Sequence, residues 1–408
     1  MTEQTVRQEW KRGWPIVLSG FFGVVLPSLY AGGLGAAIAP MSADLGWSRA
    51  TITAGPMMAA IVQLLLGPAP GLVIHRLGPR RVALSAIPLH CLALALPGAA
   101  GGSIWLWYGA WLVIGLTISF VSALLWTVGA SRCFDRSRGL AFAVVMSGAG
   151  LANAVSPLIA VAAMVHFQWT AVFPALGLFG LVASWPIVWA LFDPDRRCAQ
   201  TLEGAHELTG LDVRDIFGSV RFWAIAAVVL FQYATIGVLF VHLQPIYRDA
   251  GLSAGEAARY ASLIGVALII GRLGGGILVD YFAARFVAAG ACLLPVVSSV
   301  VLMNFEGQAW HAMLAAIALG LALGSEGDII AYLTSRYFGT RHYGSAYAVY
   351  NSLYAVGFTF APVLGGAWYD RFGNYQAVLE GVIVILAASA IILMSLGRPP
   401  EFREAHRS

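Results

Sequence analysis

The sequence predicts an all-α membrane protein with twelve transmembrane helices, arranged as two pseudo-symmetric bundles of six. Of its 408 residues, 59% are hydrophobic and only 11% are charged, against about 25% charged in an ordinary soluble domain. Twelve apolar runs are spread along the whole chain, and the second half repeats features of the first half at one offset. These three observations exclude a soluble enzyme and favour a polytopic membrane protein.

The apolar runs follow one another in order along the chain. A bilayer core needs about 20 mostly apolar residues for each helix. The first run is longer than the core of a signal peptide and no small-residue cleavage site follows it, so we expect it to remain as a helix. The predicted spans are residues 15–40, 50–74, 82–97, 103–130, 139–165, 169–192, 222–245, 257–279, 286–303, 309–334, 343–367 and 376–396. Tryptophans close to several of these ends, such as Trp14, Trp47, Trp105 and Trp169, are typical of membrane interfaces.

The placement of charge predicts the orientation in the membrane. Most of the 24 basic residues fall in loops on one side, and the positive-inside rule assigns those loops to the cytosol. The even number of spans puts both termini on that same side. We therefore expect a multi-pass protein of the cell's inner (plasma) membrane with both termini cytosolic. The net charge of +4 is too small a surplus to suggest a nucleic-acid partner.

The longest polar stretch, residues 193–219, divides the chain into two parts, residues 1–192 and residues 220–408. We interpret the stretch as a cytosolic linker between two six-helix bundles. A short amphipathic helix is expected near its end, at residues 211–217.

A shift of 205 residues aligns punctuating and charged residues of the two parts. The matched pairs include Pro40 with Pro245, Asp44 with Asp249, Gly71 with Gly276, Arg80 with Arg285, Gly139 with Gly344 and Pro157 with Pro362. Matches at a single offset indicate an internal repeat. Because each repeat has an even number of spans, both have the same orientation, as in the two halves of rocker-type secondary transporters.

The loop after the second span carries a motif that resembles the loop signature of the major facilitator superfamily. It contains Gly71, then His75 and Arg76, then Gly78 and Arg80, with histidine at the acidic position of the signature. The second copy keeps the acid, with Gly276 followed by Asp280. The resemblance implies a conformational latch, in which each loop packs against the start of a helix in the other half, where the helix dipole favours negative charge. It implies Asp280 near Arg138 and Gly139, and His75 near Tyr343 and Gly344.

Within that superfamily the chain resembles the monocarboxylate and oxalate transporter group and its bacterial relatives. The segments that carry this resemblance are Leu45 to Arg49, Val241 to Ser253, Gly271 to Gly276 and Arg336 to Gly339. The resemblance covers essentially the whole chain. It implies a secondary active transporter that moves a small, monocarboxylate-like organic anion across the cytoplasmic membrane by alternating access, coupled to protons.

Arg272 is the one basic residue well inside a predicted span. A buried arginine costs at least about 2.5 to 3.5 kcal/mol on insertion scales, so it needs an anion nearby. Glu326 and Asp328 lie at a similar depth, but they are about 200° apart around a helix, so only one can face Arg272. We hypothesise that Arg272 binds a substrate carboxylate, as the arginine at this place does in the resembled group, and that Glu326 or Asp328 carries the proton. The alternative is a permanent ion pair that locks two helices together.

Other polar residues are candidates for the walls of a central cavity. His242 lies near the outer end of its span and could exchange a proton around neutral pH, although a packing role is the alternative. Tyr347, Tyr350 and Asn351 recur at helical spacing on one predicted span, and helix packing is again the alternative. The remaining candidates for substrate binding are Tyr30 and Gln232.

The sequence contains no metal-binding cluster, phosphate loop or nucleophile triad, so we expect neither an enzyme nor a cofactor. Gly327-Asp328 and Tyr369-Asp370 faintly resemble the acids of an intramembrane aspartyl hydrolase, but Ser325 stands where that motif needs glycine. The expected partners are the organic anion, protons and the lipid bilayer, for a protein that acts as a monomer. The other function left open is a proton-driven exporter of drugs or metabolites with the same fold. Such exporters usually carry a Gly-Pro step in the fifth span, which residues 148–157 lack.

Overall fold

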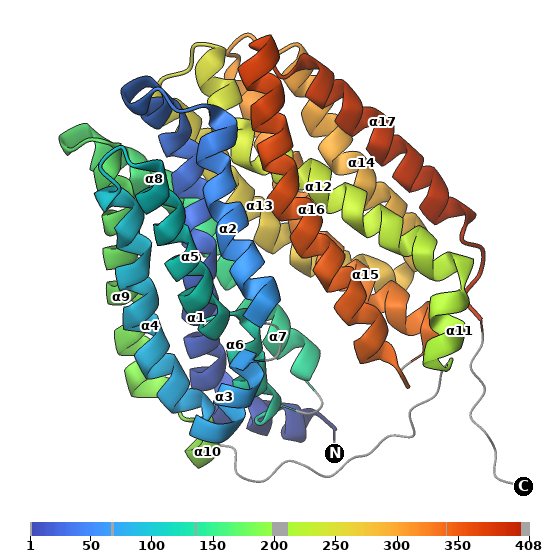
Figure 1. The fold of residues 1–408 in the computed structure, drawn as a ribbon. Helices are drawn as coiled ribbons and strands as arrows, with labels where there is room; N and C mark the ends of the chain where they lie inside the picture. The colour runs from blue at the N-terminus through green and yellow to red at the C-terminus, as the bar shows by residue number, and fades with distance from the viewer. Residues whose placement is uncertain (1, 67–68, 135–136, 198–210, 340, 401–408) are drawn as a thin grey trace, which may run out of the picture.

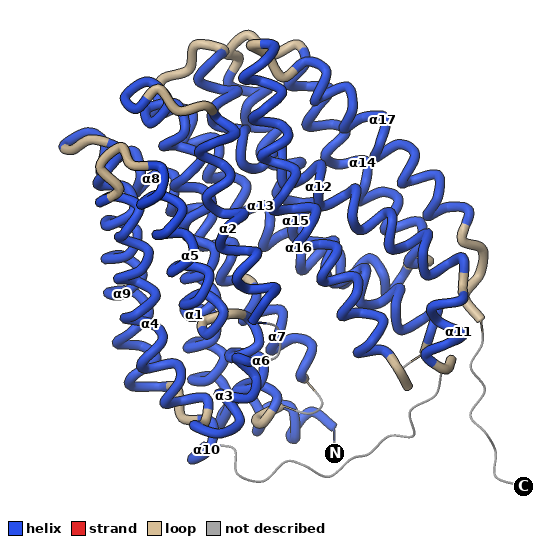
Figure 2. The backbone as a smooth tube through the Cα atoms, viewed as in Figure 1, coloured by secondary structure: helices blue, strands red, loops and turns tan. Residues whose placement is uncertain are grey.

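The structure, a computed structural model of the whole chain, describes all residues except 1, 67–68, 135–136, 198–210, 340 and 401–408. Helices joined by short loops make up this part of the chain, and it contains no strand (Figure 2). Among the described residues, eleven helical segments are long and apolar enough to cross a membrane. Helix α16 (Tyr343–Phe372), which carries several tyrosines, makes twelve. The predicted all-α fold with twelve transmembrane helices is therefore confirmed.

The first group of helices covers the first six predicted spans. It comprises α1 (Thr2–Leu45), α2 (Arg49–Leu66), α3 (Ala69–Leu77), α4 (Pro79–Ala95), α5 (Ile104–Phe120), α6 (Ala123–Ser131), α7 (Arg138–Met146), α8 (Gly148–His166) and α9 (Val172–Leu191). Three of the predicted spans are each covered by two helices: α2 and α3, α5 and α6, and α7 and α8. Between α7 and α8, the Ser147 hydroxyl donates a hydrogen bond of 2.7 Å to the carbonyl of Ala143.

The second group covers the last six predicted spans. It comprises α12 (Val220–Asp249), α13 (Ala254–Tyr281), α14 (Ala284–Met303), α15 (Ala309–Phe338), α16 and α17 (Gln376–Ser395). Between the groups lie α10 (Pro194–Arg197) and α11 (Val213–Gly218). Helix α11 confirms the short helix expected near the end of the polar stretch.

The two groups stand side by side and touch mainly near one end. Figure 1 shows the helices of the groups close together at the end that holds the α12–α13 connection, and diverging toward the end where α1 begins and α17 ends. The helix pairs that join the groups are α8 with α13, α2 with α16, and α1 with α12. Helices α8 and α13 are in contact along part of their length and separate toward the end where α1 begins.

Small residues allow the close helix crossings at this joint. A Cβ at Gly265 of α13 would overlap the backbone of Gly150 on α8, and a Cβ at Gly366 of α16 would lie 2.8 Å from the backbone nitrogen of Ala50 on α2. In membranes, such small-residue contacts let helix backbones approach and drive association by packing. These contacts hold the two groups together at one end and leave the rest of α13 to face the other group.

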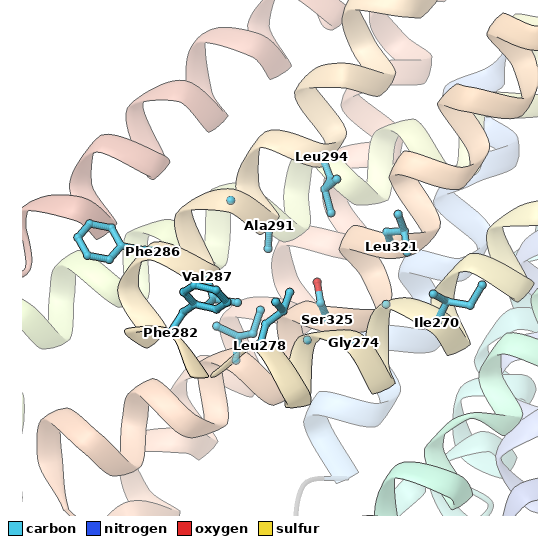
Figure 3. Close-up of a pocket in the computed structure, with 14 residues that line it drawn as sticks. Ile270, Gly274, Leu278, Phe282, Phe286, Val287, Ala291, Leu294, Leu321 and Ser325 are labelled. Carbon is cyan, nitrogen blue, oxygen red and sulfur yellow. The ribbon is translucent and has the colours of Figure 1, made fainter. Parts of the chain in front are cut away.

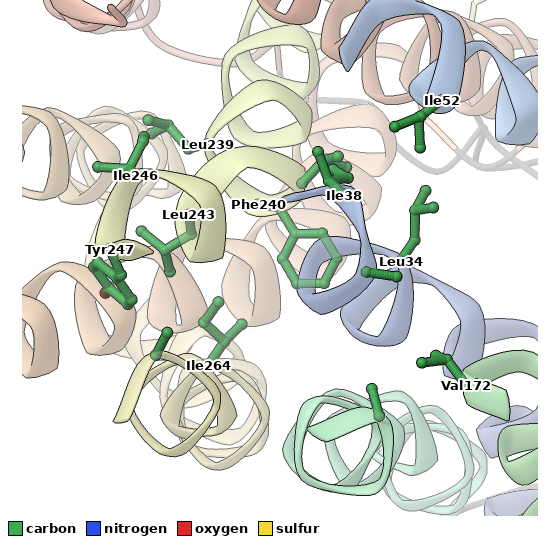
Figure 4. Packing of buried hydrophobic residues seen from close by; sticks show 14 of the residues in the cluster. Leu34, Ile38, Ile52, Val172, Leu239, Phe240, Leu243, Ile246, Tyr247 and Ile264 are labelled. Carbon is green, nitrogen blue, oxygen red and sulfur yellow. The ribbon is translucent and has the colours of Figure 1, made fainter. Parts of the chain in front are cut away.

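A buried apolar cluster lies across the joint. It includes Leu34 and Ile38 of α1, Phe240 and Leu243 of α12, and Ile264 of α13, and all five are at most 8% exposed. Figure 4 shows these side chains gathered between helices of both groups. The cluster packs the two groups against each other at the end where their helices lie close together.

Candidate functional site

Arg272 of α13 faces the first group of helices. It lies two turns beyond Gly265 on the same face of α13, about 10 Å further along the helix. Gly265 contacts α8 of the first group, so the Arg272 side chain lies just beyond the contact, toward the end where the groups diverge (Figure 1). Its side chain is only 15% exposed.

The guanidinium of Arg272 is incompletely paired. Its Nε lies 3.7 Å from Oδ2 of Asp328, which is close enough for an ion pair but too long for a hydrogen bond. Nε and Nη1 are buried without a hydrogen-bond partner among the described residues. The Asp328 side chain is 47% exposed, so it is reachable from outside the bundle. A guanidinium has five donors in a fork that suits a carboxylate, and this one has donors to spare.

Three tyrosines surround the arginine. Tyr233 of α12 and Tyr347 and Tyr354 of α16 each lie close enough to interact with the charge of Arg272. The rings of Tyr233 and Tyr354 meet edge to face, with centroids 4.3 Å apart. Tyr30 of α1 lies near Tyr354, so the first group of helices also contributes a hydroxyl. The site thus combines one cation with several nearby phenol groups.

Glu326 points in another direction, into the interior of the second group. It is 2% exposed, and Gln232 of α12 donates a hydrogen bond to its Oε1. Its Oε2 has no hydrogen-bond partner in the described part of the chain. Beside it, a small cavity of about 10 Å³ is just large enough for one water molecule. Among the described residues Glu326 has an amide partner, whereas Asp328 has a cationic one, so the two acids occupy chemically different places.

His242 belongs to a hydrogen-bonded network at the closed end. Its Nε2 lies 2.8 Å from the carbonyl oxygen of Pro362, and its Nδ1 lies 2.8 Å from the hydroxyl of Tyr375. A carbonyl oxygen can only accept, so Nε2 carries the hydrogen and Nδ1 of the neutral ring accepts from Tyr375. Burial raises the pKa of Tyr375 well above its ordinary value, which keeps this hydroxyl a donor.

Arg49 extends the network to the first group of helices. It donates to the Tyr375 hydroxyl at 3.0 Å and to Oδ1 of Asp249 at 2.9 Å. Its guanidinium also lies 3.5 Å from the centre of the Tyr369 ring. Asp370 accepts hydrogen bonds of 2.9 Å from the backbone nitrogens of Arg49 and Ala50 at the start of α2. The network therefore ties α2 to α12 and α16 by charge as well as by packing.

We expect Arg49→Gln to loosen the closed end. The Arg49 side chain is only 8% exposed, and truncating one partner of a buried charge pair costs about 2 to 5 kcal/mol. A loss of about 2 kcal/mol would shift the balance between closed and open forms about 30-fold. Distances between spin labels on cysteines introduced at Trp105 and Glu306 measure this end directly. Arg248→Gln is the matched control, because the Arg248 guanidinium donates to the nearby Leu252 carbonyl and makes no ion pair with a described residue. An unchanged distance distribution in Arg49→Gln would contradict the prediction.

The other predicted substrate-site residues lie in different surroundings. Tyr350 is 1% exposed, its hydroxyl donates to the Phe222 carbonyl at 3.2 Å, and its ring stacks on Phe222. Tyr350 thus packs between helices, which is the alternative to substrate binding that the sequence left open for this residue. Asn351 is exposed on α16. The described residues include no group of three or more His, Cys, Asp or Glu that could hold a metal ion.

The predicted latch residues lie at the end where the groups diverge. His75 and Arg76 are exposed at the end of α3. Arg80 pairs with Asp193 at 2.8 Å and donates to the Trp189 carbonyl, so its contacts stay at the end of α9. Gly71 lies in the first turn of α3, Gly78 connects α3 to α4 with a φ of 81°, and a Cβ at Gly276 would meet open space. The side chain of Asp280 lies outside the described residues.

No hydrogen bond or ion pair in the described part of the chain links His75 to Tyr343 or Gly344, the neighbours that the superfamily resemblance implies. The divergence of the helices at this end (Figure 1) separates the two loops. Contact between them needs a different arrangement of the groups.

Sequence reasoning missed most of the network at the closed end. From the sequence, Arg49 enters only through the family resemblance, Asp249 through the internal repeat and Asp370 through the comparison with an aspartyl hydrolase, and Tyr375 is given no role. One signal was present in the sequence: three charges and a tyrosine at the outer ends of spans two, seven, eleven and twelve all fall at the same predicted membrane surface. Without knowing which spans are neighbours, that signal does not identify partners.

Comparison with known proteins identifies similar chains. The family model described as Major Facilitator Superfamily matches residues 20–362 and 276–408. Monocarboxylate transporter 12 of Mus musculus is 25% identical over 307 residues, which are 65% of this chain and 60% of that protein. The zebrafish (Danio rerio) protein named Monocarboxylate transporter 12-B is 23% identical, over 64% of this chain and 61% of its own. This chain thus spans about 60% of the length of these relatives.

Two further similarities extend over nearly the full length. An uncharacterized MFS-type transporter, YcxA of Bacillus subtilis, is 24% identical over 390 residues, 90% of each chain. The crystal structure of a bacterial homolog to the human lysosomal transporter Spinster, in an inward-facing and unoccupied conformation, superimposes with a TM-score of 0.68. That likeness has 16% sequence identity over 94% of this chain and 95% of the other, so it bears on the fold alone.

Proposed function

Because the chain belongs to the major facilitator superfamily, a family of membrane transporters, we propose that it moves a small monocarboxylate together with a proton across the cytoplasmic membrane. The single observation that carries this proposal is Arg272, a nearly buried arginine with two guanidinium nitrogens lacking hydrogen-bond partners. Unpaired donors on a buried cation are costly, so the arrangement favours a ligand that supplies a carboxylate. The monocarboxylate transporter names of several relatives support this class of substrate.

Charge balance indicates how the proton is coupled. In the structure, the charge of Arg272 is balanced by Asp328 across 3.7 Å. A substrate carboxylate that binds Arg272 adds a second negative charge beside Asp328, and like charges at short distance disfavour each other. Protonation of Asp328 removes that excess. The substrate anion and the proton then move together, and the site carries the same net charge with and without its cargo.

Glu326 has a separate role in this scheme. Glu326 is buried and accepts a hydrogen bond from Gln232. In this scheme it stays a neutral acid and joins α15 to α12. His242, locked between Pro362 and Tyr375, serves the closure of the outer end rather than proton transfer. Of the three acid–base residues considered from sequence, Asp328 alone has both an exposed side chain and a cationic partner.

The arrangement of the helices fits one state of an alternating-access cycle. The positive-inside rule assigns the diverging end, with both termini, to the cytosol, and the network around Arg49 closes the opposite end. The similar solved structure is described as inward-facing, and we assign the inward-facing state to this chain. In the outward-facing state, the Arg49 network opens and the latch loops at Gly71 and Gly276 meet the other half.

The experiment that tests the proposal measures the internal pH of liposomes that contain the purified protein. Mono- and dicarboxylates are added outside one at a time, and protein-free liposomes correct for passive entry of the neutral acids. Protein-dependent acidification by some monocarboxylate is the expected result. No response to any acid, together with proton movement on adding a cationic drug, would overturn it in favour of the exporter.

A further inference from the structure

An acidic residue beside the short helix α11 lies against the start of α16. Asp212 directly precedes α11, and its Oδ1 lies 2.9 Å from Nη1 of Arg341 and 3.7 Å from Nε2 of His342. These two basic residues directly precede α16. Asp212 thus brings a negative charge to a basic part of the connection between α15 and α16.

Helix α11 is fixed to the second group of helices by apolar packing. Ile216 is 1% exposed and belongs to a buried cluster with Phe222 and Phe338. The backbone nitrogen of Leu211 donates a hydrogen bond of 3.0 Å to the Phe338 carbonyl. Because exposed ion pairs contribute little stability, these contacts, and not the pair with Arg341, hold the carboxylate in place.

The turn between α3 and α4 lies at the corresponding place in the first group. Helices α2 and α16 touch at the closed end, where Gly366 packs on Ala50. His75 is 25 residues from Ala50 along α2 and α3, and His342 is 24 residues from Gly366 along α16, so both lie about 36 to 38 Å from the contact at 1.5 Å per residue. Figure 1 shows α3 and the start of α16 at the same end of the molecule. A swing of the groups about the contact therefore brings the α3–α4 turn toward the start of α16.

The two surfaces that this swing brings together are both basic. His75 and Arg76 of the turn are exposed and make no ion pair with a described residue. Arg341 and His342 stand on the other side. Like charges at short distance repel each other, so closure of this end needs an anion between them. The Asp212 side chain is 61% exposed, so it is reachable from the approaching turn.

Other features of the second group are less suited to supply this charge. A groove of about 510 Å³ between α13 and α14 is lined by apolar residues and Ser325, and none of its lining residues is charged (Figure 3). Asp215 of α11 is exposed but makes no ion pair with a described residue. Asp328 is already paired with Arg272. Asp212 is therefore the described acid that lies against the basic start of α16.

We propose that Asp212 is the acid that closes the diverging end, with its carboxylate placed between Arg341 and Arg76 in the outward-facing state. It takes the part of the acid that the loop signature has at position 75, where this chain has histidine. The pair with Arg341 already exists in the inward-facing state, so it favours neither state. The added contact with Arg76 favours the outward-facing one. The inference rests on the alternating access of the proposed function but not on the identity of the substrate.

The test measures distances between spin labels on cysteines introduced at Trp105 and Glu306 in the full-length protein. These positions lie at the closed end, so a local loosening of α11 leaves them unchanged. We expect Asp212→Asn to lower the ratio of outward-facing to inward-facing forms about fivefold, a change of about 1 kcal/mol. Adding His75→Asp to that variant should bring the ratio back to within about twofold of the wild type, since α3 then carries the acid.

Asp215→Asn is the matched control, because it removes the same charge from the same helix but breaks no ion pair between described residues. An equal shift in Asp215→Asn, or an unchanged ratio in Asp212→Asn when the wild type shows both forms, would overturn the role of Asp212. A ratio that stays low after His75→Asp is added would overturn the replacement of the signature acid. A single distance shared by the wild type and all variants would instead overturn alternating access, and this inference with it.

Discussion

Arg272→Gln is expected to lower uptake of a transported monocarboxylate about 100-fold or more while the protein still folds. Glutamine fills similar space but cannot supply the charge or the fork of donors that a carboxylate needs. A 100-fold loss corresponds to about 2.7 kcal/mol, within the range for losing one partner of a buried charge pair. The measurement is initial uptake of the labelled acid into proteoliposomes. Arg259→Gln is the matched control, since Arg259 is an exposed arginine on the same helix.

A second variant separates substrate binding from a purely structural ion pair. If Arg272 and Asp328 only lock α13 to α15, removing both charges in Arg272→Gln/Asp328→Asn should restore stability and transport together. If Arg272 binds the substrate, the double variant should regain thermal stability but remain inactive. Wild-type uptake in Arg272→Gln, or recovery of uptake in the double variant, would show that Arg272 does not bind the substrate.

Much of the fold is predictable from the sequence, because membrane burial demands long apolar helices with satisfied backbones. All twelve predicted spans coincide with helical segments, and the deviations concern their ends and the interruptions inside the second, fourth and fifth spans. Helix α12 continues past Pro245 to Asp249, since a proline removes one donor but neighbouring contacts can keep a membrane helix intact. Helix α16 continues to Phe372, where the positive φ of Gly373 (70°) ends it.

The site is less predictable, because rotation about a helix axis depends on packing. An isolated intramembrane arginine is visible in any sequence, and so are two acids at its depth. Which acid faces Arg272 depends on how α15 is turned, and that is set by Gly320 and Gly324, whose missing side chains let it press against the backbone of α13. The partners of Arg49 come from helices about 200 and 320 residues away, a distance that local patterns do not bridge.

Asp328→Asn is expected to abolish coupling to the proton gradient while leaving exchange of substrate across the membrane largely intact. Asparagine cannot take up a proton, so the variant has no means to neutralise the second negative charge in step with substrate binding. A gradient of one pH unit is worth 1.36 kcal/mol per proton, which lets a one-to-one symporter accumulate substrate about tenfold. The wild type should approach that ratio in proteoliposomes, and the variant should show no accumulation. Counterflow of labelled for unlabelled acid reports exchange and needs no net proton movement.

Glu326→Gln provides the matched comparison on the same helix. Glutamine keeps an oxygen that accepts from Gln232 and removes no charge from a neutral acid, so accumulation should change by less than about twofold. The two acids are only two residues apart, but Asp328 lies beside the Arg272 cation and Glu326 is bonded to the Gln232 amide. A nearby cation favours the charged form of an acid, and burial disfavours it. The reverse outcome, with accumulation lost in Glu326→Gln and kept in Asp328→Asn, would assign the proton to Glu326. The charge of Asp328 would then serve only to balance Arg272 in the empty site.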